Sequence, residues 1–435
     1  MRKGIVWFKN DLRLHDHEAL HAAANATDII YPLYIFDPRD YRTLPLGFTK
    51  TGPFRTSFLI ETVISLRTAL RQRGSDLLVR VGKPEEIIPE IITQVGATDV
   101  YTAKETGTEE RTILETLENV MHPLKAALHQ YWMHTLFHDE DVPWPIRQVP
   151  ETFTTFRKES EKSVAVRPLF DVPGNWHVLT DIEAGSIPSC ADLGVPPEAI
   201  DSRRAYAFAG GEQPALDRLN YYLWESDKIL EYKNTRNGLL GPDYSSKLSP
   251  WLAVGAISPK TIYSALKEYE SERKKNSGTY WLFFELLWRD FFRFMAKKHQ
   301  HKIFLPNGLN SDPPEFSNNI QTFRTWQEAR TGEPFIDANM QELNLTGYMS
   351  NRGRQNVASF LMHDLGINWT WGAKWFENRL IDYDSSSNWL NWAYIAGVGN
   401  DPRKGRHFNI ESQSAQYDPK GLYMKHWLDS QPAFQ

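Results

Sequence analysis

Cysteine and long apolar runs are both scarce in this sequence. Cys190 is the single cysteine among 435 residues, which excludes an intramolecular disulfide and a cysteine-rich metal site and is typical of a reducing compartment. Charges follow the start, MRKGIVWFKNDLRLHD, too soon for a signal peptide. The most apolar later run, TYWLFFELLW, stops at Arg289, well short of the roughly 20 residues that cross a bilayer. We therefore expect a cytoplasmic protein without a membrane span, in which Cys190 is a structural or surface thiol.

Glycine-rich phosphate loops and net positive charge are also lacking. No GxGxxG or Walker motif occurs, so a ligand crevice in the first part of the chain would hold something other than a conventionally bound dinucleotide or triphosphate, or would be empty. The formal charge of -5 gives no overall attraction to nucleic acid or to anionic membranes. Any binding to either must come from local patches.

The first part of the chain alternates β-rich apolar runs with helical patterns. We expect strands at 4–8, 29–36, 76–82, 99–103 and 127–132, and helices at 17–25, 53–73, 85–95 and 109–121. This order is typical of βαβ units, and right-handed crossovers make residues 1–132 an α/β domain with a doubly wound parallel sheet. A ligand crevice is expected at the carboxyl ends of its strands.

Composition divides the remainder of the chain. Residues 133–203 are rich in Pro, Gly and Ser and weakly periodic, which predicts a long connector. Residues 204–435 show helical patterns and no convincing strand series, so the second domain is expected to be all-α. We expect a monomer.

The segment TYWLFFELLWRDFFRFMAKKH places Trp281, Glu285 and Arg289 at intervals of four on one helix face, with Trp288 beside them. A buried helix with an i,i+4 ion pair is one interpretation. Buried charges are costly without partners, however. The alternative is a binding site in which the glutamate hydrogen-bonds the edge of a planar heterocycle that stacks on an indole.

The motif DYSSKLSPWL precedes a helix that Pro250 is expected to open. Hydroxyl and free N–H groups at a helix start suit a phosphate or diphosphate, and Lys247 would add the counter-charge. An ordinary N-cap formed by the serine before Pro250 is the alternative interpretation.

Polar and aromatic residues alternate unusually between Asn344 and Phe408. Asp382 and Asp384 lack the further oxygen ligands of a calcium loop, so a metal site is not expected. Arg354 is suited to pair with one of these aspartates. A buried polar network in a helical core would explain any single pair, whereas the whole set indicates a large ligand with many hydrogen-bonding groups.

A basic segment, DPRKGRHF, follows Trp392 and Tyr394. It contributes Arg403, Lys404 and Arg406. Basic residues beside aromatic ones are typical of nucleic-acid contacts, with phosphates on the former and bases on the latter.

Long motifs in order resemble the photolyase and cryptochrome family, and within it the cryptochrome DASH branch, over essentially the whole chain. They include IVWFKNDLRLHDHEAL, DYSSKLSPWL, YWLFFELLWRDFFRF, TGYMSNRGRQNVASF and LIDYDSSSNWLNWAYIAGVGNDPR. The resemblance implies an FAD folded in the helical domain, with Asn388 near flavin N5 and an ion pair of Arg354 and Asp382 beside the ring. The residues that it assigns to FAD are Tyr232, Ser245, Ser246, Lys247, Leu248, Ser249, Trp281, Glu285, Trp288, Arg289, Asn351, Arg354, Asp382, Asp384 and Asn388.

The resemblance also implies light-driven repair, in which the excited reduced flavin gives an electron to a cyclobutane pyrimidine dimer in DNA and takes it back after the ring splits. Glu285 would hydrogen-bond the dimer, and Trp288 would stack on it once it is flipped out. Tyr394 and Gln355 replace the tryptophan and methionine of conventional dimer photolyases, which is typical of the DASH branch and matches its preference for single-stranded DNA. The catalytic residues implied are Glu285, Trp288, Asn351, Arg352, Gln355 and Tyr394.

Electron supply to the flavin is implied to run along tryptophans. Trp392 and Trp369 match the inner and middle positions, but Phe316 stands at the outer one, so Trp371, Trp375 or a tyrosine would have to take over. The alternative function is therefore a non-enzymatic blue-light photoreceptor that binds DNA or RNA and signals through flavin photoreduction.

The α/β domain resembles the family's antenna domain, where a 5,10-methenyltetrahydrofolate can sit between the domains. Glu105, in AKETGTEER, matches the folate-contacting glutamate. Acidic residues are also common at helix starts for electrostatic reasons, which is the alternative explanation of this residue.

Overall fold

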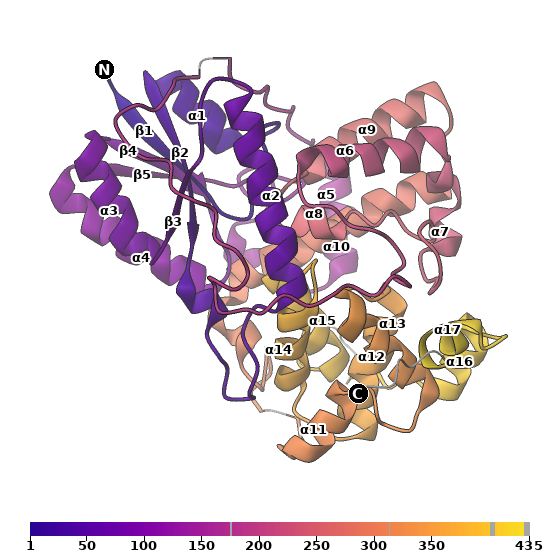
Figure 1. Ribbon diagram of the computed structural model, residues 1–435. Helices are drawn as coiled ribbons and strands as arrows, with labels where there is room; N and C mark the ends of the chain where they lie inside the picture. Colours follow the sequence, from indigo (N-terminus) through magenta and orange to yellow (C-terminus); the bar gives the residue numbers. More distant parts are fainter. Residues whose placement is uncertain (175, 313, 401–404, 430–435) are drawn as a thin grey trace.

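Two domains make up the chain (Figure 1). The computed structural model describes residues 1–174, 176–312, 314–400 and 405–429. The N-terminal domain is a parallel sheet covered by helices, and a helical domain lies beside it. The predicted fold class, an α/β domain followed by an all-α domain, is confirmed.

Five strands pair in parallel in the order β3-β2-β1-β4-β5. Their bounds are β1 Lys3–Phe8, β2 Ile29–Phe36, β3 Leu78–Val81, β4 Asp99–Ala103 and β5 Ala127–Tyr131. The central strand β1 pairs with β2 from Lys3 opposite Ile29 to Phe8 opposite Tyr34. Every residue of β4 and all but the first of β2 are buried. Strands covered on both faces have near-continuous apolar sequences, which is why the sequence predicted these two correctly.

Helices cover both faces of the sheet. They are α1 (Glu18–Ala26), α2 (Pro53–Arg71), α3 (Pro84–Val95) and α4 (Thr108–Met121), and their ends agree with the predicted ranges to within two residues. Leu20 of α1 packs in the same layer as Val6 of β1, whereas Ile91 of α3 packs with Ile5 in the opposite layer. Neighbouring side chains of β1 thus serve two different helix layers, as the alternation of a strand requires. Short 3-10 turns follow β2 at Pro38–Tyr41 and α4 at His122–Leu124.

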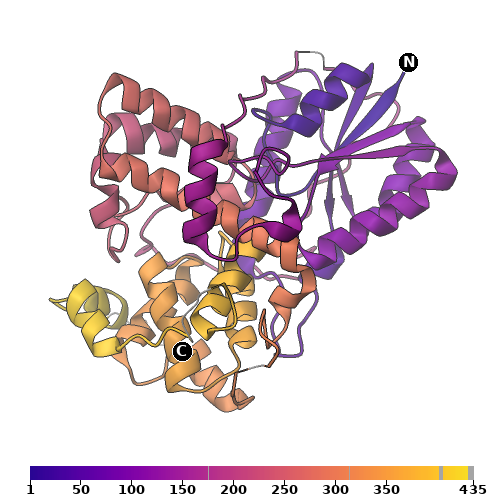
Figure 2. The same cartoon turned by 180° about the vertical axis from the view of Figure 1, so that it is seen from behind.

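The segment between the domains differs from the predicted plain connector. It contains a 3-10 turn at Ile146–Gln148 and an α-helix, α5, at Phe153–Ser163. Phe153, Phe156 and Ser160 are the buried residues of α5, and the helix packs against α10 (Ser277–His299), as the view from behind shows (Figure 2). The remaining residues of α5 are polar, so its sequence shows too narrow an apolar stripe to be predicted as a helix.

The helical domain is built around α10, whose start is fixed by a capping box between Asn276 and Thr279. Within the described residues after 203, pairing of the strand type is limited to one bridge between Ser317 and Ile367. None of the helices in the described part of the chain is long and apolar enough to cross a membrane. The other α-helices are α6 (Glu212–Asn220), α7 (Tyr232–Thr235), α8 (Ser249–Ala253), α9 (Pro259–Glu272), α11 (Ile320–Gln327), α12 (Pro334–Thr346), α13 (Asn351–Ser359), α14 (Trp369–Arg379), α15 (Ser385–Ala396), α16 (Ile410–Tyr417) and α17 (Leu422–Leu428), with short 3-10 or π turns at Tyr221–Glu225, Lys228–Glu231, Gln300–Phe304 and Phe360–Asp364.

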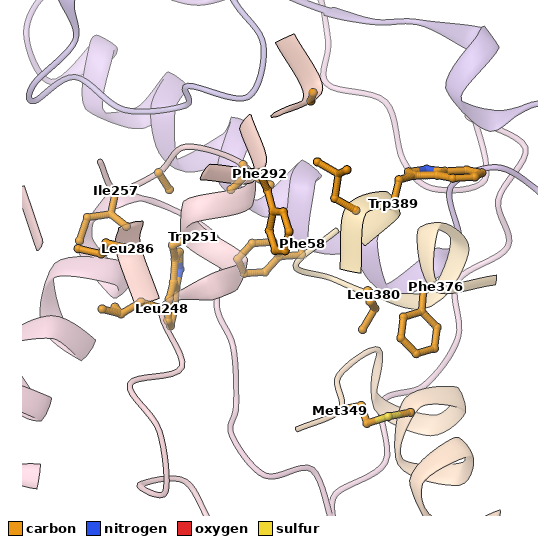
Figure 3. Close-up of a cluster of buried hydrophobic side chains, with 14 of the residues drawn as sticks. Phe58, Leu248, Trp251, Ile257, Leu286, Phe292, Met349, Phe376, Leu380 and Trp389 are labelled. Carbon is orange, nitrogen blue, oxygen red and sulfur yellow. The ribbon is translucent and has the colours of Figure 1, made fainter. Parts of the chain in front are cut away.

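The two domains share one hydrophobic core. Phe58 of α2 packs against Trp251 of α8 with ring centroids 6.3 Å apart (Figure 3). The N–H of Leu12 donates to the carbonyl of Val254 at 3.1 Å across the domain boundary. Gly255, with φ +69°, comes so close to the backbone of the first domain that an added Cβ would lie 2.0 Å from a carbonyl oxygen. The site described next is therefore supported by both domains.

Candidate functional site

The loop before α8 holds a buried lysine. Lys247 adopts φ 61°, a conformation that is uncommon outside glycine, and only 2% of it is exposed. Its Nζ lies 3.2 Å from the ring centroid of Tyr244 and 4.7 Å from that of Tyr348. Among the described residues, this Nζ has no hydrogen-bond partner. Burial lowers the pKa of Lys247 well below its ordinary value, and an approaching anion would favour its charged form.

Arg218 of α6 fixes the backbone of the same loop. Its guanidinium donates to the carbonyl of Ser246 at 2.9 Å and to that of Ser245 at 3.2 Å. It also pairs with Asp243 at 3.0 Å. The sequence analysis did not single out Arg218, because nothing in its own segment connects it to a loop more than 20 residues further along the chain.

Ser249 links this loop to the aspartates before α15. Helix α8 begins at Ser249 with Pro250 in its first turn, as predicted, but Leu248 occupies the N-cap position. The alternative of an ordinary serine N-cap is therefore wrong. Ser249 Oγ instead donates to Asp382 Oδ2 at 2.7 Å.

The predicted pair between Arg354 and an aspartate is confirmed. Arg354 Nη2 lies 2.8 Å from Asp382 Oδ2, and its Nε donates to the carbonyl of Met349 at 2.9 Å. The guanidinium also lies 5.4 Å from the ring centroid of Tyr348, the ring that Lys247 contacts on the other side of the site. Asp382 Oδ1 is buried without a hydrogen-bond partner in the described chain, so one carboxylate oxygen is free to accept from a ligand.

Asp384 caps helix α15 and pairs with α10. Its Oδ1 accepts from the N–H of Ser387 at 2.8 Å, and its Oδ2 accepts a short hydrogen bond from Arg293. Burial would raise the pKa of Asp384, but Arg293 and Arg289 outweigh it and lower this pKa to about 2. One turn later, the buried Asn388 uses its amide N–H to bond a backbone carbonyl of α14 at 3.0 Å.

Glu285 on α10 pairs with a residue that the sequence analysis missed. Its carboxylate lies 2.8 Å from Arg236, whereas Arg289 donates to the carbonyl of His134. The predicted i,i+4 ion pair within α10 is therefore wrong, because Arg236 reaches Glu285 from the end of α7, one turn after the buried Tyr232. Burial raises the pKa of Glu285 and Arg236 opposes this shift. Because these two influences on its pKa oppose each other, the Glu285 carboxyl group can either hold or release a proton.

Two tryptophans, Trp281 and Trp288, flank Glu285 in the sequence of α10. Trp288 stacks on Phe153 of α5 with centroids 3.7 Å apart and meets Tyr394 edge-on at 6.0 Å. Trp281 lies 5.4 Å from the guanidinium of Arg236, and its Nε1 is buried without a hydrogen-bond partner in the part of the chain that the structure describes. The role of Phe153 was not predicted because its segment was assigned to the connector.

The start of α13 lies at the surface side of the site. Asn351 is exposed, and Arg352 and Gln355 are half-buried. Arg352 donates to Asn237 Oδ1 at 3.4 Å, and its guanidinium lies 4.7 Å from the ring centroid of Tyr417 in α16.

The predicted basic patch is only partly described. Arg403 and Lys404 lie outside the described residues. Arg406 donates to the hydroxyl of Tyr394 at 2.6 Å and covers its ring at 4.3 Å. The predicted neighbourhood of a basic and an aromatic residue is therefore present for this pair, whereas Trp392 is buried at 2% exposure and contacts other rings.

The two predicted electron carriers have different aromatic neighbours. Trp392 meets Trp326 edge-on with centroids 6.2 Å apart, while Trp369 meets Trp389 at 5.8 Å. The half-buried Trp371 contacts Phe323 at 5.5 Å, and Phe323 stacks on Trp326 at 5.9 Å. The structure thus adds an aromatic connection from Trp392 through Trp326 toward the surface, which local spacing in the sequence cannot reveal.

Glu105 is buried between the domains in the loop before α4, not at the helix start. Its Oε1 lies 3.5 Å from Lys9 and 3.7 Å from His134, and it has no hydrogen-bond partner among the described residues. Burial would raise the pKa of Glu105, but Lys9 and His134 hold it well below its ordinary value. An ionised carboxylate oxygen is therefore available in this interdomain region.

The chemistry of the unpartnered groups identifies a suitable ligand. Both donors and acceptors are left over, which suits an anionic group combined with a ring that carries N–H and C=O groups. FAD has both, and the donor set of the site fits it. The described chain has no cluster of three or more side chains that could hold a metal ion. The unpartnered buried atoms in and beside the site include Lys247 Nζ, Trp281 Nε1, Arg293 Nε, Arg352 Nε and Asp382 Oδ1.

Comparisons with known proteins agree with this assignment. The family model "DNA photolyase" matches residues 4–173, and "FAD binding domain of DNA photolyase" matches residues 281–434. Cryptochrome DASH of Gloeobacter violaceus is 49% identical over 98% of this chain and 85% of its own length, and that of Xenopus laevis is 48% identical over 98% and 82%. A cryptochrome structure from Synechocystis sp. PCC6803 superposes with TM-score 0.95 at 48% identity, covering 99% of this chain and 89% of that one. A class III photolyase from Agrobacterium tumefaciens gives 0.84 at 25% identity, covering 99% and 87%. The chain belongs to the cryptochrome DASH group of the photolyase and cryptochrome family, and its cofactor is FAD.

Proposed function

We propose that this flavoprotein repairs cyclobutane pyrimidine dimers in single-stranded DNA under blue light. The observation that carries the proposal is the position of Glu285, a partly exposed carboxyl group on the same helix as Trp281 and Trp288, the second of which meets Tyr394 edge-on. A hydrogen-bonding acid beside two flat apolar rings is what a fused pair of pyrimidines needs, since their faces are apolar and their edges carry C=O and N–H groups.

FAD, when bound, reduced and excited by light, would supply the electron that opens the dimer and would take it back after the ring splits. The protein's own residues bind and orient. Arg354 and Asp382 hold each other in place where the flavin ring would lie. Lys247 supplies an amine that a neighbouring anionic group would keep charged. Glu285 would hydrogen-bond the carbonyl edge of the pyrimidines, and burial raises its pKa, which favours the protonated form.

Arg236 has to exchange partners in this mechanism. In the structure it occupies the Glu285 carboxylate at 2.8 Å. A phosphate of the DNA strand offers Arg236 an alternative and stronger anionic partner. If Arg236 moved to the phosphate, its positive charge would no longer lower the pKa of Glu285. Binding of the strand and readiness of the acid are thereby coupled.

The preference for single strands follows from Tyr394. A phenol ring covers less of a base than an indole, and the Tyr394 hydroxyl is held by Arg406 at 2.6 Å. Each base-on-aromatic stack contributes about 1–3 kcal/mol. Extracting a base from a duplex costs a few kcal/mol, roughly the same amount, and least in a single strand. Because the tyrosine ring is smaller, it provides less stacking energy to offset the cost of extracting the dimer from a duplex.

The test is illumination of the reduced protein with dimer-containing oligonucleotides, as single strands and as duplexes, followed by quantification of restored thymine. Single strands should be repaired faster than duplexes. A dark reaction and an undamaged strand serve as controls. No restored thymine in single strands, with flavin bound, would exclude the lyase.

The second candidate is a photoreceptor that binds nucleic acid and signals through flavin photoreduction. Phe316, at the position expected for the outer electron donor, favours it, since it cannot supply an electron as a tryptophan would. A light-dependent change in nucleic-acid affinity without restored thymine would support this function over repair.

A further inference from the structure

A groove of about 180 Å³ lies between the loop after α7 and the segment that joins α16 to α17. Its lining is mostly apolar. Leu240 is 42% exposed and Leu422 is 55% exposed, although leucine side chains are normally covered. The residues that line the groove are Leu239, Leu240, Tyr417, Asp418, Pro419, Lys420, Leu422 and Tyr423.

The charges around the groove favour an anionic ligand. Asp418 is buried, and its two carboxylate oxygens accept from the N–H groups of Tyr423 and Met424 at 3.0 Å each, so its charge is used within the protein. Lys420 is exposed at the rim. An apolar groove with a cation at its rim suits a group that joins a flat ring to a phosphate.

Arg352 connects the groove to the site already described. Its guanidinium lies over Tyr417, which lines the groove, at 4.7 Å, and its Nη2 reaches Asn237 at 3.4 Å. Its Nε is buried without a hydrogen-bond partner within the described chain. Arg352 follows Asn351 at the start of α13, so its side chain borders both the groove and the candidate functional site.

We propose that this groove binds the nucleobase next to the pyrimidine dimer on one side of a single DNA strand. Arg352 and Lys420 hold the phosphates, and Tyr417 and the two exposed leucines take the base. The proposal rests on the function proposed above and names a further contact of the same substrate. The groove is smaller than the roughly 300–1,000 Å³ of ordinary ligand pockets, so it suits one ring system and not a whole cofactor. Alternating cations and flat apolar surfaces are what sequence-tolerant binding to single strands uses.

A base in this groove must be unstacked from its neighbours. A single strand offers such a base at little cost, whereas a duplex does not. The groove thus gives a reason for strand preference that is independent of Tyr394.

The test measures affinity for short substrates with the flavin-loaded protein. The variant is Leu240→Ser combined with Leu422→Ser, and its matched control is Leu169→Ser, an equally exposed leucine of the connector at 42%. The substrates are the thymine-dimer dinucleotide and two trinucleotides that add one base on the 5′ or the 3′ side. We expect the groove variant to bind one of the trinucleotides about tenfold more weakly, with dinucleotide affinity and flavin spectrum unchanged.

Other outcomes would overturn the proposal. These are affinities equal to those of the control, a loss that appears already with the dinucleotide, or an equal loss with both trinucleotides. A change in sedimentation instead of DNA affinity would show that the groove binds a second copy of the chain. Wild-type protein that binds a trinucleotide through the groove yet restores no thymine would refute the repair function and leave the groove intact.

Discussion

Replacing Asp384 with asparagine removes one buried charge and little else. Asparagine caps helices about as well as aspartate, so the N–H of Ser387 keeps an acceptor at the start of α15. Arg293, only 5% exposed, loses the carboxylate that it faces. We expect the Asp384→Asn variant to fold with reduced stability.

The size of the loss can be derived in two ways. Burial alone would raise the pKa of Asp384, but Arg293 and Arg289 lower it from 3.8 to about 2. That fall corresponds to roughly 2–3 kcal/mol of stability at neutral pH. Leaving one partner of a buried ion pair uncompensated costs about 3–5 kcal/mol in comparable cases. We expect the free energy of unfolding to fall by about 2–5 kcal/mol.

Urea denaturation of the flavin-loaded protein measures this difference, with flavin content followed by visible absorbance. Folding lowers the pKa of Asp384. The stability that its charge contributes is therefore fully present above pH 3.8 and is lost as the pH falls toward 2. The difference between wild type and variant should therefore be constant at neutral pH and shrink across that acidic window.

The matched control removes both charges at once. Arg293→Met combined with Asp384→Asn should be more stable than Asp384→Asn alone, since no unpaired buried charge remains. Equal stability of wild type and Asp384→Asn would refute the reasoning. A double variant less stable than the single one would refute it as well.

The other contacts of the site can be tested one at a time. Asp382→Asn breaks a buried ion pair and should weaken flavin retention on gel filtration by about tenfold or more, and unchanged retention would contradict its assignment. Glu285→Gln should keep the flavin spectrum and slow dimer repair by about tenfold, since the amide cannot supply the carboxyl proton, and equal repair rates would remove Glu285 from the mechanism. Trp392→Phe should stop flavin photoreduction under blue light and Trp371→Phe should slow it, whereas normal rates in both would exclude this route. Arg406→Ala should weaken binding to all single strands alike and lower the salt slope by about 1, and an unchanged slope would count against that contact.

The sequence predicted those parts of the fold that depend on local patterns. Strands 29–36 and 99–103 were predicted to the residue, because they are buried on both faces. Helix α5 was missed, since only Phe153, Phe156 and Ser160 are buried and the surface that covers them is α10. A helix whose apolar side is this narrow can be identified only with its packing partner in view.

The candidate site, like the fold, was predicted only in part. The residues alone predicted that Arg354 pairs with Asp382 or Asp384, and the family resemblance implied Asp382, which the structure shows. The pairing of Glu285 with Arg236 was not predicted, since helices α8 and α9 separate the two residues in sequence. Arg289 at the i+4 position was the nearer choice, but its guanidinium is used by a backbone carbonyl. Backbone acceptors compete for arginine, and spacing alone does not reveal them.

The shared core between the domains limits how the two domains can move against each other. Domains joined by a small polar interface move against each other by default, whereas a large apolar interface prevents such motion. Here the ring of Phe58 is packed against Trp251 (Figure 3), and the carboxylate of Asp290 accepts from the N–H groups of Leu136 and Phe137 at 2.9 and 2.8 Å. Hinged closure is therefore blocked. If the protein signals through flavin photoreduction, as in the second proposed function, the signal would have to travel through local changes, such as the exchange of an arginine between two anions, while the two domains keep their arrangement.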